Sequence, residues 1–290
     1  MRPGPFLIVA AALLAGGCGG STSADGAGVQ VVTAFYPLTF LVERVGGERT
    51  SIVDLTPGGV EPHDLELTAG QVRDLSEAEL VVFLGGGFQP AVEDVVSDLD
   101  GVPVLDGLEV GGVRPGGADD GVDPHVWLDP VLMTELAEAV AAAVAEVDPE
   151  GAGGYERNLA TLRDELEALD TDLEEGLSSC ERNEIVTSHE SFGYLAARYG
   201  LEQIGIAGID PEAEPSPDRL AEVADIARAN DVTTIFFEEL APRDVAETLA
   251  DEVGVETDVL DPLETQPAEG DYFTQMRANL EALRDALGCT

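Results

Sequence analysis

Short apolar runs alternate with stretches of helical periodicity along most of the chain. Continuous apolar runs predict buried strands in the first half at residues 29–35, 51–55, 80–84 and 102–105. The intervening segments predict helices at residues 37–45, 68–78, 91–99 and 130–147. Thr68 is a suitable N-cap for the second of these helices. Strand and helix in alternation indicate a parallel sheet with helices on both faces.

The second half of the chain repeats this pattern. Strands are predicted at residues 184–187, 203–209, 233–237 and 258–260. Helices are predicted at residues 192–199, 218–230, 242–253 and 271–287. Residues 107–122, which are rich in Gly and Asp, show no periodicity and predict a loop.

One stripe of apolar residues at helical spacing lies between the two halves. Its members are Tyr155, Leu159, Leu162, Leu166, Leu169, Leu173 and Leu177. The stripe predicts one long helix that joins two domains. A coiled coil is the alternative, although the stripe is short for one. The predicted fold class is therefore α/β, with two parallel-sheet lobes at residues 29–148 and 180–290. The long helix at residues 149–179 links them.

The N-terminus has the pattern of an export signal. An apolar run at residues 6–15 is too short to span a bilayer and ends in small residues before Cys18. This pattern resembles a bacterial lipoprotein cleavage site, which predicts a signal peptide at residues 1–18 and a lipid on Cys18. The Gly- and Ser-rich residues 19–28 then form a flexible tether. The alternative is an ordinary secretory signal that is cut nearby.

The charge balance argues against partners that need a basic surface. The chain has 58 acidic residues against 14 basic ones, a net charge of −44. Nucleic-acid binding needs a basic face, so it is not expected, and neither is attraction to anionic lipid. Because the acids are spread along the chain, we interpret them as a solvated coat, which would suit a saline habitat.

The chain contains only three histidines, and each follows an extended or strand-like segment. His63, His125, His189 and also Asp261 fall in loops after predicted strands. Ligands of open α/β sheets bind at the carboxyl ends of strands, so these loops predict one shared site. The alternative for any one of them is ordinary: a lone histidine is more often solvated, and an aspartate before proline often starts a turn.

Several segments resemble the cluster 9 solute-binding proteins, the zinc and manganese receptors of ABC importers. The matching stretches are Val60-Glu61-Pro62-His63-Asp64, Asp123-Pro124-His125-Val126-Trp127-Leu128-Asp129-Pro130, Thr187-Ser188-His189-Glu190-Ser191-Phe192-Gly193-Tyr194-Leu195, Glu212-Ala213-Glu214-Pro215-Ser216-Pro217, Ile235-Phe236-Phe237-Glu238-Glu239 and Leu260-Asp261-Pro262-Leu263. The resemblance implies a periplasmic-binding-protein fold of cluster A-I type with a metal between the lobes. It also implies a membrane permease as partner, a monomer and no enzymatic activity.

The same resemblance implies that His63, His125, His189 and Asp261 are the metal ligands. Three imidazoles and one carboxylate suit Zn²⁺ and favour it over Mn²⁺. Glu61, Glu238 and Glu239 are reserve carboxylates that could replace Asp261 or support the ligands.

Two departures from the family pattern stand out. The loop before His125 carries Asp119 and Asp120 but lacks the histidines found in many zinc receptors. The segment Gly87-Phe88-Gln89-Pro90 lacks the Glu-x-Trp that many members have.

The sequence is compatible with three other functions. The chain could be a manganese- or iron-binding member of the same family, or it could serve in addition as a surface adhesin. A zinc-dependent hydrolase would need a general base, for which Glu61 or Glu190 could be nominated. The sequence has no His-Glu-x-x-His helix.

The cysteines predict one disulfide. If Cys18 carries a lipid, Cys180 and Cys289 are left as a pair in an exported protein, where disulfides persist. The alternative is two buried free thiols.

Overall fold

The first lobe is built on a four-stranded parallel sheet. The computed structural model describes Met1 and residues 28–110, 114–115, 122–238, 240 and 243–290. The strand order is β2-β1-β3-β4. The strands are β1 (Val29–Thr33), β2 (Thr50–Asp54), β3 (Leu80–Phe83) and β4 (Val104–Asp106). The predicted signal peptide with Cys18, nearly all of the tether, Asp119, Asp120 and Glu239 lie outside the described residues.

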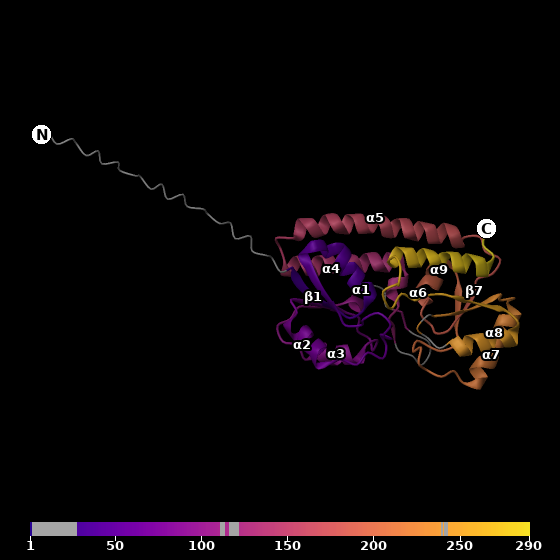
Figure 1. The fold of residues 1–290 in the computed structure, drawn as a ribbon. Helices are drawn as coiled ribbons and strands as arrows, with labels where there is room; N and C mark the ends of the chain where they lie inside the picture. Colours follow the sequence, from indigo (N-terminus) through magenta and orange to yellow (C-terminus); the bar gives the residue numbers. More distant parts are fainter. Residues whose placement is uncertain (2–27, 111–113, 116–121, 239, 241–242) are drawn as a thin grey trace.

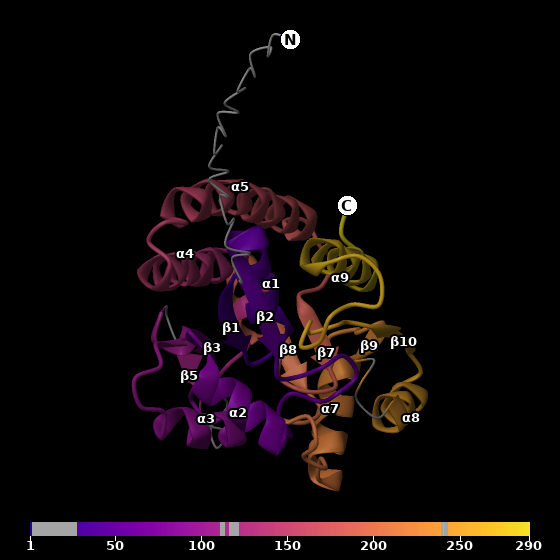
Figure 2. The same cartoon turned by 60° about the vertical axis from the view of Figure 1, so that its left-hand side comes forward.

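Helices cover both faces of this first sheet. They are α1 (Tyr36–Gly46), α2 (Ala69–Glu77), α3 (Pro90–Ser97) and α4 (Pro130–Val147). Figures 1 and 2 show α2 and α3 on the opposite side of the sheet from α4. Thr68 caps α2 in a reciprocal capping box with Gln71, as its sequence position predicts. Coverage on both faces explains why the central strand β1 is almost continuously buried and its neighbour β3 is entirely apolar.

The second lobe repeats this architecture. Its sheet is also parallel, with the order β10-β9-β7-β8. The strands are β7 (Glu184–Thr187), β8 (Glu202–Gly205), β9 (Thr234–Phe237) and β10 (Glu256–Val259). The helices are α6 (Gly193–Tyr199), α7 (Pro217–Ala229), α8 (Arg243–Val253) and α9 (Tyr272–Leu287). The predicted fold class, two α/β lobes joined by a long helix, is confirmed.

The long helix α5 (Ala152–Leu177) runs along both lobes (Figure 1). Six residues of the predicted stripe are buried, and Leu159 is half-buried. They belong to an apolar core that extends from the first lobe through α5 to α9. A smaller core in the second lobe includes Val186, Ile235 and Leu249. The shared core joins the two lobes over a broad contact, which favours a fixed arrangement.

Cys180 and Cys289 form a disulfide, so this prediction is confirmed. The bond attaches the end of α9 to the segment that leads into β7, the strand that precedes His189. None of the described helices is long and apolar enough to cross a membrane.

The segment at residues 107–122 is more ordered than expected where it is described. Residues Gly107–Glu109 form a 3₁₀ turn, and β5 (Arg114–Pro115) pairs antiparallel with β6 (Val122–Asp123). The β6 strand leads directly to His125, so the histidine follows a paired strand and not a free loop.

Candidate metal centre

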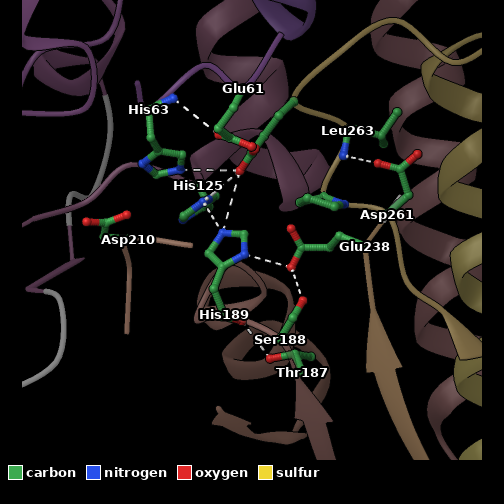
Figure 3. A network of polar contacts seen from close by, with 12 residues as sticks. Glu61, His63, His125, Thr187, Ser188, His189, Asp210, Glu238, Asp261 and Leu263 are labelled. Carbon is green, nitrogen blue, oxygen red and sulfur yellow. Dashed lines mark hydrogen bonds and ion pairs between the residues drawn. The ribbon is translucent and has the colours of Figure 1, made fainter. Parts of the chain in front are cut away.

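Four side chains from both lobes meet at the carboxyl ends of the strands. They are His63 after β2, His125 after β6, His189 after β7 and Glu264 after β10. One candidate ligand atom from each lies within 4.8 Å of the other three. Figure 3 shows the three imidazole rings turned toward one another. The predicted convergence of the three histidines is therefore observed in the described structure.

His125 is oriented by a carboxylate next to it in sequence. Its Nδ1 lies 2.9 Å from Asp123 Oδ1, which also accepts a hydrogen bond from the His125 backbone N–H at 3.0 Å. A carboxylate only accepts, so Nδ1 carries the proton and Nε2 of the neutral ring presents its lone pair. That Nε2 lies 3.2 Å from Glu264 Oε1.

Asp123 itself is held by helix α6 of the second lobe. The Tyr194 hydroxyl donates to the Asp123 carbonyl at 3.1 Å. A Cβ on Gly193 would come within 2.7 Å of Asp123 Oδ2, so only glycine permits this close approach. The orientation of His125 thus depends on packing between the lobes.

His189 has the same arrangement with a distant partner. Its Nδ1 lies 2.6 Å from Glu238 Oε1, which also accepts a hydrogen bond from the Ser188 hydroxyl at 2.6 Å. Its Nε2 lies 3.2 Å from His125 Nε2. With both Nδ1 atoms protonated toward carboxylates, two lone pairs face each other across this short distance. Such a pair requires a proton or a metal cation between its members.

His63 completes the set from a loop. Its Nε2 is buried and forms no hydrogen bond with the described residues, although Glu264 Oε1 lies 3.4 Å away. The Phe88 ring packs edge-on against the imidazole at 4.7 Å between ring centres. A buried nitrogen with no hydrogen-bond donor aimed at it fits a site that a cation fills.

The fourth member of the group is Glu264, and the structure does not bring Asp261 into it. Asp261 Oδ1 accepts a hydrogen bond from the Leu263 backbone N–H at 2.7 Å, and Figure 3 shows it apart from the imidazoles. Asp261 therefore shapes a turn, which was the alternative for an aspartate before proline. Glu264 is 3% exposed and lies 3.2, 3.4 and 3.6 Å from the Nε2 atoms of His125, His63 and His189. The one sequence signal for Glu264 was its place in the same loop after a strand.

The reserve carboxylates have other contacts. Glu61 Oε1 accepts from the His63 backbone N–H at 3.2 Å, and Glu238 orients His189. Glu190 lies 4.0 Å from the Arg219 guanidinium, and its backbone N–H donates to Gly208. Glu61 and Glu190 are the residues nominated as a hydrolytic base.

The electrostatics of the centre favour a positive charge inside it. Burial lowers the pKa of His125, but Asp123 and Glu264 outweigh it, so the pKa is raised. Burial is likewise outweighed at His189, where Glu238 and Glu264 raise the pKa well above its usual value. The three imidazoles hold the pKa of Glu264 well below its usual value despite its burial. Burial and the neighbouring Glu264 raise the pKa of Glu61 to about 8.

The sequence matches, over residues 31–286, the ZnuA family described as "Zinc-uptake complex component A periplasmic". This chain belongs to the ZnuA family. The resemblance to cluster 9 receptors is thereby confirmed.

Individual relatives cover most of this ZnuA-family chain. The high-affinity zinc uptake system protein ZnuA of Bacillus subtilis (strain 168) is 34% identical over 309 residues, covering 98% of this chain and 97% of that protein. The zinc-binding lipoprotein AdcA of Streptococcus pneumoniae serotype 4 is 34% identical over 287 residues, covering 92% of this chain. This chain spans only 57% of AdcA.

A solved structure supports the same relationship. The Zn(II)-bound ZnuA-like domain of Streptococcus pneumoniae AdcA superposes with a TM-score of 0.79 at 34% identity. The match covers 90% of this chain and 99% of that domain.

Proposed function

We propose that this protein is an extracytoplasmic receptor that captures one Zn²⁺ between its lobes and delivers it to the membrane permease of an ABC importer. The observation that carries the proposal is the convergence of three Nε2 atoms and one Glu264 oxygen in a buried centre. Two relatives, one named as a zinc uptake protein and the other as a zinc-binding lipoprotein, support zinc as the cargo.

The donor set explains the choice of metal. Imidazole nitrogen suits zinc better than manganese, and three such donors compound the preference. Zinc accepts four donors in tetrahedral geometry, which matches the number of side chains at the centre. Manganese and iron prefer more oxygen donors, so they are the weaker alternatives.

The centre suits a carrier better than a zinc hydrolase. Catalytic zinc keeps a coordination position open for water, whereas four protein donors close the site. The Glu61 carboxylate is also engaged in the loop itself, because its Oε1 accepts a hydrogen bond from the His63 backbone N–H.

We propose a monomer anchored by a lipid on Cys18, with Gly- and Ser-rich residues 19–28 as the tether. Mass spectrometry of the membrane fraction should find a diacylglyceryl group on Cys18. An unmodified Cys18 in a secreted product would refute the anchor without affecting the metal site.

The experiment that tests the cargo is a metal titration of the mature protein. We expect one zinc per chain, with zinc preferred strongly over manganese in competition. Glu264→Ala should weaken zinc binding, whereas Asp261→Asn should leave it close to wild type, because asparagine can still accept the Leu263 hydrogen bond. Equal affinity for the two metals, or unchanged zinc binding in Glu264→Ala, would refute this ligand set.

A further inference from the structure

The turn that precedes Glu264 has an unusual backbone. Leu263 has a φ of +61°, in the left-handed region that non-glycine residues rarely adopt, and its side chain is fully buried. Such a conformation persists only where the surroundings over-determine it. At this position it redirects the chain, so that Glu264 faces the imidazoles while Asp261 does not.

Helix α9 holds the start of this turn through one buried amide. Asn279 Oδ1 accepts from the Asp261 backbone N–H at 3.1 Å, and Asn279 Nδ2 donates to the Asp261 carbonyl at 2.7 Å. The Asn279 side chain is 1% exposed. One side chain thus satisfies both backbone groups of Asp261, whose carboxylate in turn accepts from the Leu263 N–H.

The first lobe holds the middle of the turn. Trp127 Nε1 donates to the Pro262 carbonyl at 2.6 Å, and Trp127 stands two residues after His125. The Tyr272 hydroxyl of α9 donates to the Trp127 carbonyl at 2.6 Å. The segment that carries His125 is therefore bonded directly to the segment that carries Glu264.

We propose that Asn279 and Trp127 are positioning residues that fix the Glu264 carboxylate against the three imidazoles and thereby set zinc affinity. This inference rests on the proposed zinc-binding function. A fixed turn loses little conformational freedom when metal binds, so the affinity depends on the hydrogen bonds that hold it. Neither residue hydrogen-bonds a ligand atom of the centre. Their hydrogen bonds go to the turn that carries Glu264, while the Trp127 ring also packs against His125 at 5.0 Å between ring centres.

The test is a double-mutant cycle on the full mature chain with zinc as the probe. Asn279→Leu keeps the approximate volume but removes both hydrogen bonds, and we expect zinc affinity to fall about 10- to 100-fold, as for other supporting residues. In the Glu264→Ala background the same substitution should change affinity less than about twofold, because the residue that it positions is gone. Trp127→Phe, which removes the indole N–H and keeps an aromatic ring, should behave in the same way and replaces Asn279→Leu if that variant does not fold.

A matched control is available on α5. Asn158 Nδ2 also donates to a backbone carbonyl, that of Val45 at 2.8 Å, but it lies away from the metal centre. Asn158→Leu should lower the thermal unfolding midpoint without changing zinc affinity. Equal losses of affinity with and without Glu264, or no loss in both Asn279→Leu and Trp127→Phe, would overturn the inference. Absence of zinc binding by the wild type would instead refute the proposed function.

Discussion

The two central histidines and His63 are held in different ways. His125 and His189 are fully buried, and each has a carboxylate at Nδ1 that fixes its tautomer. His63 is 10% exposed at its side chain, and no hydrogen bond to its Nδ1 is found among the described residues. Its loop is held by backbone contacts: Glu61 accepts from the His63 N–H, and Gln89 Nε2 donates to the Pro62 carbonyl at 3.2 Å.

This difference indicates two roles within one centre. The pair His125 and His189 forms a fixed platform, since both rings are fully buried and each is held by a carboxylate at Nδ1. His63 sits on a loop after β2, an edge strand, with fewer fixed contacts. Regions with fewer buried contacts open at lower free-energy cost, so in the proposed zinc site we expect His63 to bind the metal last and to release it first.

The largest expected effect is that of pH on the central pair. Zinc competes with protons on the imidazoles, and the neighbouring carboxylates raise the pKa values of His125 and His189, so this pair takes up a proton at a higher pH than an ordinary histidine does. Zinc affinity should therefore start to fall above pH 6.5, by about tenfold per pH unit, because the two facing Nε2 atoms share one proton. Zinc titrations between pH 8 and pH 5.5 measure this. A loss confined to pH values well below 6.5 would contradict it.

Single alanine substitutions should show different effects on zinc affinity at the central pair and at His63. His125→Ala and His189→Ala should each weaken zinc binding by more than about 100-fold, beyond the range for supporting residues. His63→Ala should cost less and should act mainly by speeding zinc release, since the platform still captures the ion. Stopped-flow rates with a fluorescent zinc chelator give both rate constants. If all three variants lose the same zinc affinity, with the same changes in the association and release rate constants, His63 does not differ from the central pair.

Removing the orienting carboxylates should affect only the central pair. Asp123→Asn and Glu238→Gln remove the charge at Nδ1, so zinc affinity should fall about 10- to 100-fold. The onset of acid loss should also move to lower pH, because these carboxylates raise the pKa values of His125 and His189. His63→Ala serves as the control, since it leaves both carboxylates in place. An unchanged pH profile in Asp123→Asn and Glu238→Gln would show that other groups govern the titration.

The smallest expected effect concerns the support of the His63 loop. Gln89 is fully buried and its Nε2 also donates to the Thr56 hydroxyl at 3.1 Å. Gln89→Glu replaces the donating amide by a carboxylate, which cannot donate to the Pro62 carbonyl or the Thr56 hydroxyl. This loss should cost about 1–3 kcal/mol of unfolding free energy. Zinc affinity should fall less than about tenfold. Affinity should not change further when Gln89→Glu is added to His63→Ala. Urea unfolding and zinc titration of the single and double variants check this, and a further loss in the double variant would refute the link.

Local patterns predicted the elements well because they depend on nearby residues. The stripe from Tyr155 to Leu177 gave a helix whose buried face matches the predicted one. The N-cap at Thr68 and the disulfide between Cys180 and Cys289 were also predicted correctly. The segment at residues 107–122 was predicted less well, because the pairing of β5 with β6 is short and leaves little periodic signal.

The sequence alone determined which imidazoles form the centre and which metal they suit. Only three histidines exist, and each follows a strand whose carboxyl end must face the crevice. Tertiary structure alone decided which carboxylate joins them. Asp261 and Glu264 stand in one loop, and the left-handed backbone at Leu263 turns one inward and the other away. That backbone is held by Asn279 and Trp127, which are distant in sequence, so no local pattern could show it.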